Sequence, residues 1–277
     1  MVDFVIKHQE FGFERFNYDV TQIARRMFRE SLDLFFRVYL KKKRFLAIVV
    51  IFALVPLTSI PVNFTNTSAY YAFSIPSQLG TYVEVAAVIL AGDFISEDLK
   101  SNHKYFILSL PMRRSSLFAS KLTAVWISVI MAGLVVPLLT SLGVGFYKLG
   151  VWPPPGFWWA ILEMGFIALA FTGVTSALSI VGDWKLSLLA NVLVWFLAYN
   201  IITQTIDTYF PHYLYLSLLG LSLLSGFLVL KHPPSLIQQG GLTLYQIQPL
   251  TAVGVILMYL AVGYALSYYG YVKYSRF

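Results

Sequence analysis

The 277-residue chain contains no cysteine and few charged residues. Without cysteine it cannot form disulfide bonds, a thiolate zinc site or a cysteine nucleophile. Asp, Glu, Lys and Arg make up 12% of the residues, about half the share of a typical soluble domain. Apolar residues make up 58%, and the mean hydropathy is +0.70. These values exclude a soluble globular enzyme, a disordered chain and a coiled coil, and they indicate a polytopic membrane protein.

The sequence also lacks the motifs of a nucleotide-binding or catalytic chain. It has no glycine-rich phosphate loop ending in Lys and Ser or Thr, so we expect no ATP to bind this chain in that manner. The four histidines are far apart, without metal-ligand spacing and without an obvious triad partner. We therefore predict that the chain is not an enzyme and that it holds no metal or cofactor. The histidines are His8, His103, His212 and His232.

Long apolar stretches predict an all-α polytopic membrane protein. A helix that crosses the hydrocarbon core needs about 20 apolar residues. The first such stretch follows 44 mostly polar residues, so we expect no cleavable signal peptide. Six stretches are long enough: 45–62, 78–96, 117–146, 158–181, 187–206 and 250–272.

The distribution of Lys and Arg predicts the orientation of the spans. Residues 1–44 hold ten of the 20 basic residues, and residues 97–121 hold five more. Basic residues accumulate in cytoplasmic loops, so both segments are expected in the cytosol, with the hairpin around 63–77 outside. We therefore predict a protein of the cell membrane whose N-terminus is cytosolic.

A seventh apolar run, 214–230, leaves the number of spans open. If it crosses the membrane, the chain has seven spans and the C-terminus is outside. If it enters and returns, the chain has six spans, and non-helical backbone at that depth must be covered by protein or line a cavity. Ser225-Gly226, Pro233-Pro234 and Gly240-Gly241 supply the breaks that a returning segment needs.

The N-terminal region, 1–44, contains an amphipathic pattern over 19–40 that predicts a helix in the membrane interface. Apolar residues such as Val20, Ile23 and Met27 recur at helical spacing, while Arg and acidic residues fill the other face. A basic amphipathic helix beside a membrane lies in the plane of the headgroups. Two roles are open for it: an anchor on membrane lipid, or a lever that contacts a cytosolic partner.

The loop over 97–114, between the second and third spans, carries the most informative pattern. Its apolar core, 105–110, is bounded by charged residues and ends at Pro111, which stops a helix. A short amphipathic helix in a cytosolic loop can lie on the membrane or dock in a groove of a soluble partner.

This loop resembles that of the ABC type-2 transporter permease family. The matching residues are Glu97 and Asp98, the run Leu108-Ser109-Leu110-Pro111, Arg113 and Lys121. Asn102 stands where the family often has glycine. The resemblance extends to the basic helix before the first span. It also extends to Gln248-Pro249-Leu250-Thr251, which is similar to a family run that closes a re-entrant segment. It therefore implies six spans plus a re-entrant extracellular segment at about 207–249.

The resemblance implies the permease subunit of an ATP-driven transporter and favours an exporter. Such a permease, occupying 45–277 here, pairs with a second, identical or related permease. Two cytosolic ABC ATPase subunits bind ATP and Mg and drive the pair; no nucleic acid is involved. The loop would be the coupling helix that contacts an ATPase. The residues expected to do so are Glu97, Asp98, Lys100, Tyr105, Leu108, Leu110, Pro111, Arg113 and Arg114.

Polar residues inside the spans are candidates for the substrate pathway. Charge in hydrocarbon is costly, so Glu84 marks either a pathway or a carboxyl bonded to a neighbouring helix. Asn191 and Asn200 in the fifth predicted span must face protein and are further candidates. For Glu163 we favour a structural role over a place in the pathway. Two alternatives stay open: a secondary transporter that uses Glu84 for ion coupling, and a membrane scaffold that does not transport.

Overall fold

The computed structural model describes residues 43–59, 70–92, 114–180, 184–218, 220–221, 225–230, 236–239, 242–245 and 249–274, together with residues 29 and 33. The amphipathic helix predicted over 19–40 lies outside the described residues except for positions 29 and 33. The coupling residues predicted between 97 and 113 lie outside them as well.

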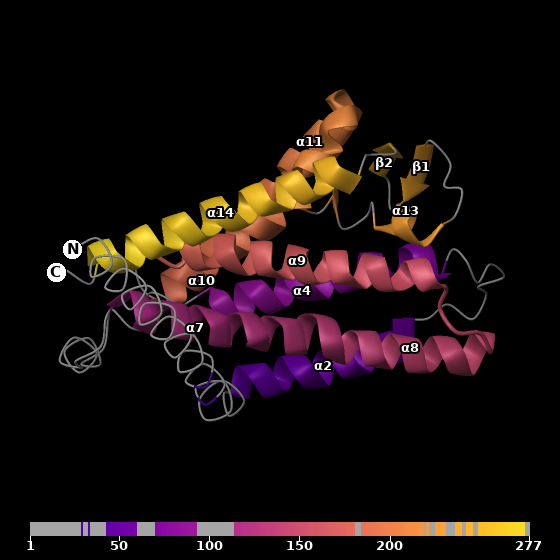
Figure 1. Ribbon diagram of the computed structural model, residues 1–277, viewed down its shortest axis with the longest axis horizontal. Helices are drawn as coiled ribbons and strands as arrows, with labels where there is room; N and C mark the ends of the chain where they lie inside the picture. Colours follow the sequence, from indigo (N-terminus) through magenta and orange to yellow (C-terminus); the bar gives the residue numbers. More distant parts are fainter. Residues whose placement is uncertain are drawn as a thin grey trace, which may run out of the picture.

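The described chain is an elongated bundle of helices (Figure 1). Helices α4 and α9 form its middle layer, with α14, α10 and α11 on one side and α2, α7 and α8 on the other. Three stretches within the long helices are π-helical turns: η2, η3 and η4. The elements of the bundle are α2 (Lys43–Ser59), η2 (Tyr70–Ser74), α4 (Ile75–Ala91), α7 (Arg114–Val129), η3 (Ile130–Val135), α8 (Val136–Leu149), α9 (Pro155–Leu178), α10 (Trp184–Val192), η4 (Leu193–Tyr199), α11 (Asn200–Tyr209) and α14 (Pro249–Tyr274).

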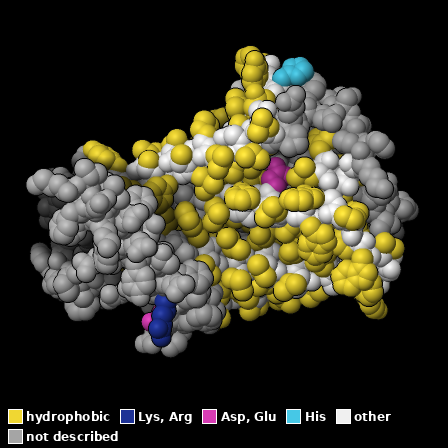
Figure 2. All heavy atoms as spheres, in the orientation of Figure 1, with side chains coloured by type: hydrophobic (Ala, Val, Ile, Leu, Met, Phe, Trp, Pro, Cys, Tyr) yellow, Lys and Arg dark blue, Asp and Glu magenta, His cyan; other side chains and the backbone are white. Residues whose placement is uncertain are grey.

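Five described helices are long and apolar enough to cross a membrane, which confirms the prediction of a helical multi-pass membrane protein. Helix α2 is also apolar, and its described part is 17 residues long. On the face of the bundle seen in Figure 2, the described surface is covered mostly by hydrophobic side chains, as a lipid-facing surface requires. The five helices are Tyr70–Ala91, Ser115–Tyr147, Pro155–Leu178, Lys185–Tyr209 and Leu250–Val272.

The second predicted span begins earlier than the hydropathy indicated. The prediction began it at residue 78, whereas the helix starts at Tyr70. Tyr70 and Tyr71 are buried, and their hydroxyls donate hydrogen bonds to the carbonyls of Ser141 (3.2 Å) and Val151 (2.6 Å). Both tyrosine hydroxyls are thus paired inside the protein, so this less hydrophobic stretch can belong to the helix.

Contacts between the helices establish their directions. Gly173 of α9 lies against Gly263 of α14, and Ile180 lies against Gly270, so α9 and α14 run parallel. Helix α10 runs antiparallel to α9, because the Ser187 hydroxyl donates to the Ser179 carbonyl and η4 then lies farther back along α9. Helix α11 therefore ends, and α14 begins, at the same end of the bundle.

The described parts of the chain between α11 and α14 are short pieces near that end (Figure 1). They are η5 (Pro211–Leu216), a 3₁₀ turn; α13 (Gly226–Val229); and an antiparallel pair, β1 (Leu236–Gln239) with β2 (Leu242–Tyr245). In the part of 210–248 that is described, no helix has the length of a span. Helix α13 packs against the start of α9, where Gly156 approaches the Leu228 carbonyl.

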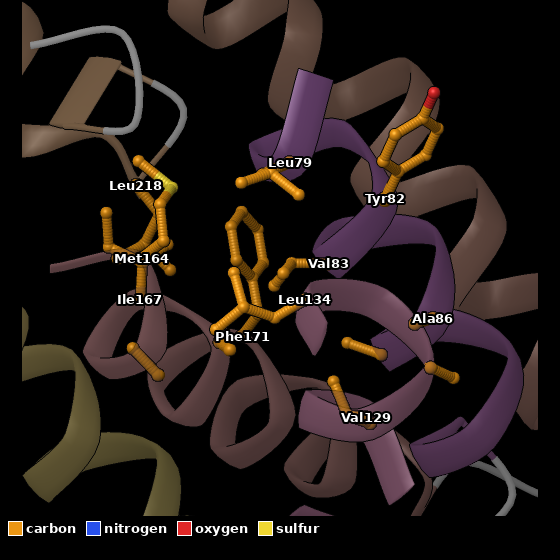
Figure 3. Close-up of a cluster of buried hydrophobic side chains, with 14 of the residues drawn as sticks. Leu79, Tyr82, Val83, Ala86, Val129, Leu134, Met164, Ile167, Phe171 and Leu218 are labelled. Atoms are coloured by element: carbon orange, nitrogen blue, oxygen red, sulfur yellow. The ribbon is translucent and has the colours of Figure 1, made fainter. Parts of the chain in front are cut away.

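The best-buried apolar side chains meet between α4, α9 and the turn η3. Phe171 of α9 points toward Leu79 and Val83 of α4 and toward Leu134 of η3 (Figure 3). Leu218, from the segment after η5, reaches Met164 in the same cluster. Leu134 is 6% exposed, and the other five side chains are at most 1% exposed to solvent. This cluster therefore forms the packed middle of the bundle.

Candidate functional site

Glu84 is the most unusual polar residue of the bundle interior. It lies on α4, its side chain is 5% exposed, and its neighbours on the chain, Val83 and Val85, are apolar. Its Oε1 atom has no hydrogen-bond partner within the described residues. A buried carboxyl without a full set of partners is costly at membrane depth, which makes it a functional candidate. Glu163, on α9, is partly exposed by comparison.

Asn191 connects two helices at the end of the bundle where α4 stops. Its buried Nδ2 donates to the Gly92 carbonyl at 3.3 Å and to the Ser187 carbonyl at 3.0 Å. Gly92 closes α4, and carbonyls at a helix end have no partner within the helix. Asn191 therefore pairs a terminal carbonyl of α4, and this geometry favours a structural link over a place in an open pathway.

Asn200 bonds within its own helix. Its Nδ2 donates to the carbonyls of Trp195 (3.4 Å) and Phe196 (3.2 Å), which both belong to the π-helical turn η4. The wider π turn disturbs the regular α-helical bonding pattern, and the amide supplies an additional donor there.

Of the three pathway candidates, Asn191 lies apart from the other two along the bundle. Asn191 meets α4 at Gly92, eight residues beyond Glu84, which is about 12 Å along a helix. Asn200 lies nine residues beyond Asn191, about 13 Å along its helix by the same rise. Both offsets run from the level of Asn191 toward the same end of the bundle, because η4 lies beside Phe171, which itself faces Leu79 and Val83 of α4. Glu84 and Asn200 therefore lie at a similar depth, and Asn191 does not share a compact site with either of them.

A row of buried hydroxyl groups along α9 was not singled out by the sequence analysis. The Trp195 indole donates to Thr175 Oγ1, and the Ser267 hydroxyl of α14 donates to the Gly173 carbonyl, both at 3.0 Å. The sequence pattern that could have revealed this row is the recurrence of Ser and Thr at helical spacing over 172–179. Hydrogen bonds between helices in a membrane hold the helices together. The fully buried members are Thr172, Thr175, Ser176, Ser179, Ser187 and Ser267.

The predicted coupling segment connects α4 to α7 at the end of the bundle where α10 begins. Helix α4 closes at Gly92, beside Leu188 and Asn191 of α10, and α7 begins at Arg114. Of the predicted coupling residues, Arg114 alone falls within the described chain, as the first residue of α7. The others, Glu97, Asp98, Lys100, Tyr105, Leu108, Leu110, Pro111 and Arg113, lie outside it.

The first turns of α7 are packed against the end of α14. The Phe118 ring lies 5.3–5.8 Å from the ring centres of Tyr264, Tyr268 and Tyr271. Aromatic pairs at these separations stabilise packing beyond their buried area. These three tyrosines attach the helix that follows the coupling segment to the rest of the bundle.

The fold and these sites define a class, the helical multi-pass membrane proteins. Searches against known protein families and against curated proteins found no match to this chain.

Proposed function

We propose that the chain is the membrane-spanning permease subunit of an ABC exporter, driven by separate cytosolic ATPase subunits. The observation that carries the proposal is the segment 93–113. It leaves one span and enters the next at one end of the bundle, and its sequence has an apolar run closed by Pro111 and followed by arginines. A segment so attached can transmit a push from a soluble partner to two spans.

The charges at this end of the bundle support a cytosolic location for it. Arg114 and Lys121 lie in the first turns of α7, and Lys185 lies at the start of α10. Lys and Arg are enriched on the cytoplasmic side of membrane proteins. In the proposed orientation, residues 1–44 with their ten basic residues also lie in the cytosol. The membrane in this proposal is the cell membrane.

Six spans with a re-entrant segment at about 207–249 agree best with the helix directions. Since α9 and α14 run parallel and α11 ends where α14 begins, the chain between them makes no net crossing. Backbone carbonyls in this segment find partners: the Tyr259 hydroxyl donates to Leu216 (2.7 Å) and the Ser217 hydroxyl to Leu214 (3.0 Å). This pairing is what non-helical backbone at membrane depth requires.

The proposal includes a second permease, identical or related. Among the five long described helices, Lys185–Tyr209 and Leu250–Val272 have the least protein cover: 22% of their most apolar part is buried, against 50–61% in the other three. Their faces are open to lipid or to another permease. ATP and Mg belong to the ATPase partner in this proposal.

The test is purification of the tagged chain from its native membranes in mild detergent, followed by mass spectrometry. A stoichiometric soluble ATPase is expected, and ATP turnover that depends on transport. The double variant Leu108→Asp/Arg113→Glu should uncouple turnover from transport without changing insertion. Tyr147→Asp serves as the control, because this 87% exposed site lies at the far end of the long helix that follows the segment. A homo-oligomer without an ATPase in several detergents, or unchanged coupling in the double variant, would contradict the proposal.

A second candidate function, an ion-coupled carrier, is favoured by the buried carboxyl of Glu84 alone. Its test is flux into proteoliposomes that contain only this chain and a proton gradient. Flux that needs no ATPase and is abolished by Glu84→Gln would support the carrier and refute the permease.

A further inference from the structure

The long helix that follows the coupling segment changes its hydrogen-bonding pattern near its middle. Residues Ser115–Tyr147 form 33 residues of continuous helix, but Ile130–Val135 are π-helical. The backbone N–H of Val136 donates to the Met131 carbonyl, five residues back. Pro137 follows at once, and proline has no N–H to donate to the carbonyl four residues before it. Proline and π turns are the common causes of bends in helices.

Both halves of this helix contact the helix Tyr70–Ala91, but their other partners differ. The inner half, α7, contacts α4 and α14, and its Phe118 lies among the tyrosines of α14. The outer half, α8, packs along α2, and its Ser141 carbonyl accepts a hydrogen bond from Tyr70 of η2. Gly145 of α8 also lies directly against the Tyr70 ring. Besides this shared contact, α7 is attached to α14 and α8 is attached to α2.

The turn η3 itself is held closely against the centre of the bundle. A methyl group added to Gly133 would lie 2.9 Å from Cβ of Ala86 and 3.0 Å from Cα of Val83, both on α4. Leu134, the next residue, faces Phe171 of α9 (Figure 3). The turn where the hydrogen-bonding pattern changes is therefore also in close backbone contact with α4, so the helix is held in place at the point where it can bend.

We propose that η3 and Pro137 form a hinge at which α8 swings relative to α14 while α7 keeps its contacts with α14. The hinge lies in the helix that continues from the predicted coupling segment, but its existence does not depend on what that segment binds. The arm from Val135 to Tyr147 is 12 residues, about 18 Å long. A change of about 20° in the bend, the size that defines a sharp kink, moves the end of α8 by about 6 Å.

The absence of cysteine allows the test in the full-length chain, because introduced cysteines are the only labelling sites. An outer spin-label pair joins Tyr147→Cys of α8 to Leu250→Cys of α14, both highly exposed. An inner pair joins Ser115→Cys of α7 to Leu186→Cys of α10, which are also exposed. Distances are measured by pulsed electron paramagnetic resonance on the protein in lipid nanodiscs.

The hinge predicts an outer-pair distance distribution about 6 Å broader than that of the inner pair. Pro137→Ala restores the missing N–H and should narrow the outer distribution without changing the inner one. Pro155→Ala is the matched control, since proline in the first turn of α9 replaces no internal bond. Pro137→Leu repeats the test if the alanine variant is poorly folded. An outer distribution as narrow as the inner one in the unaltered chain, or one that neither Pro137 variant narrows, would overturn the proposal.

Discussion

The contact between α9 and α14 is close enough that a single methyl group should weaken it measurably. A Cβ atom on Gly263 would lie 2.7 Å from the backbone nitrogen of Val174 and 2.8 Å from the carbonyl carbon of Gly173. Both atoms are backbone, so neither can turn aside as a side chain can. Since ordinary contact begins at 3.4 Å, Gly263→Ala must separate the two helices by about 0.7 Å there.

The energetic cost has two parts. Forcing an extra methyl group into a packed interface costs about 1–3 kcal/mol. The Ser267 hydroxyl lies one turn along α14 and donates to the Gly173 carbonyl at 3.0 Å, so the same separation lengthens this bond beyond hydrogen-bonding range. A hydrogen bond between membrane helices contributes about 0.6 kcal/mol. We expect the free energy of unfolding to fall by about 2–3 kcal/mol.

The assay is reversible unfolding in mixed detergent and SDS micelles, followed by circular dichroism and tryptophan fluorescence. Gly254→Ala is the matched control, because it lies on the same helix and an added methyl group there meets no atom within 4 Å. The difference between the two variants removes the gain in helix propensity, which both share. Equal unfolding free energies for the two variants, within about 0.5 kcal/mol, would refute the packing argument.

Three further predictions concern polar side chains of the interior. Asn191→Ala should lower the unfolding free energy by about 1–3 kcal/mol, because the Gly92 carbonyl loses its donor from α10. Asn200→Ala should lower it by less than about 1 kcal/mol, because its amide bonds only within its own helix. Equal losses for the two variants in the same unfolding assay would contradict this prediction. Trp195→Phe keeps the ring packing but removes the indole donor to Thr175, so it should cost about 0.5–1 kcal/mol; a loss above about 2 kcal/mol would mean that packing was disturbed. Glu84→Gln should leave the unfolding free energy unchanged or raise it. Glu84→Lys should severely lower the yield of folded protein, measured by size-exclusion chromatography. A well-folded lysine variant would contradict the buried position of Glu84.

The spans were the most predictable part of the fold. The apolar stretches at 117–146, 158–181, 187–206 and 250–272 match observed helices to within about three residues, because each stretch carries its own hydropathy. The early start of the second span was not predictable in this way. Tyr70 and Tyr71 are partnered by carbonyls of Ser141 and Val151, 71 and 80 residues along the chain.

The candidate site was predictable only in part. Glu84 could be selected from sequence, since an acid in an apolar stretch is unusual wherever the helix lies. Asn191 was also selected, but its contact with Gly92 joins residues 99 positions apart, and no local pattern indicates that pairing. The predicted coupling residues stay a prediction, because most of them lie outside the described chain.

The sequence by itself determined that this is a multi-pass helical membrane protein and where its main spans lie. Hydropathy is a sum over neighbouring residues, so it can be evaluated without knowing the fold. Only the tertiary structure decided that α9 and α14 run side by side in parallel and that hydroxyl groups join α9 to α10 and α14. It also decided that α7 contacts α14 whereas α8 packs along α2. These features depend on which helix faces meet. In a membrane the choice of faces rests on close contact and on the pairing of polar groups far apart in sequence, since burial in lipid favours all apolar faces alike.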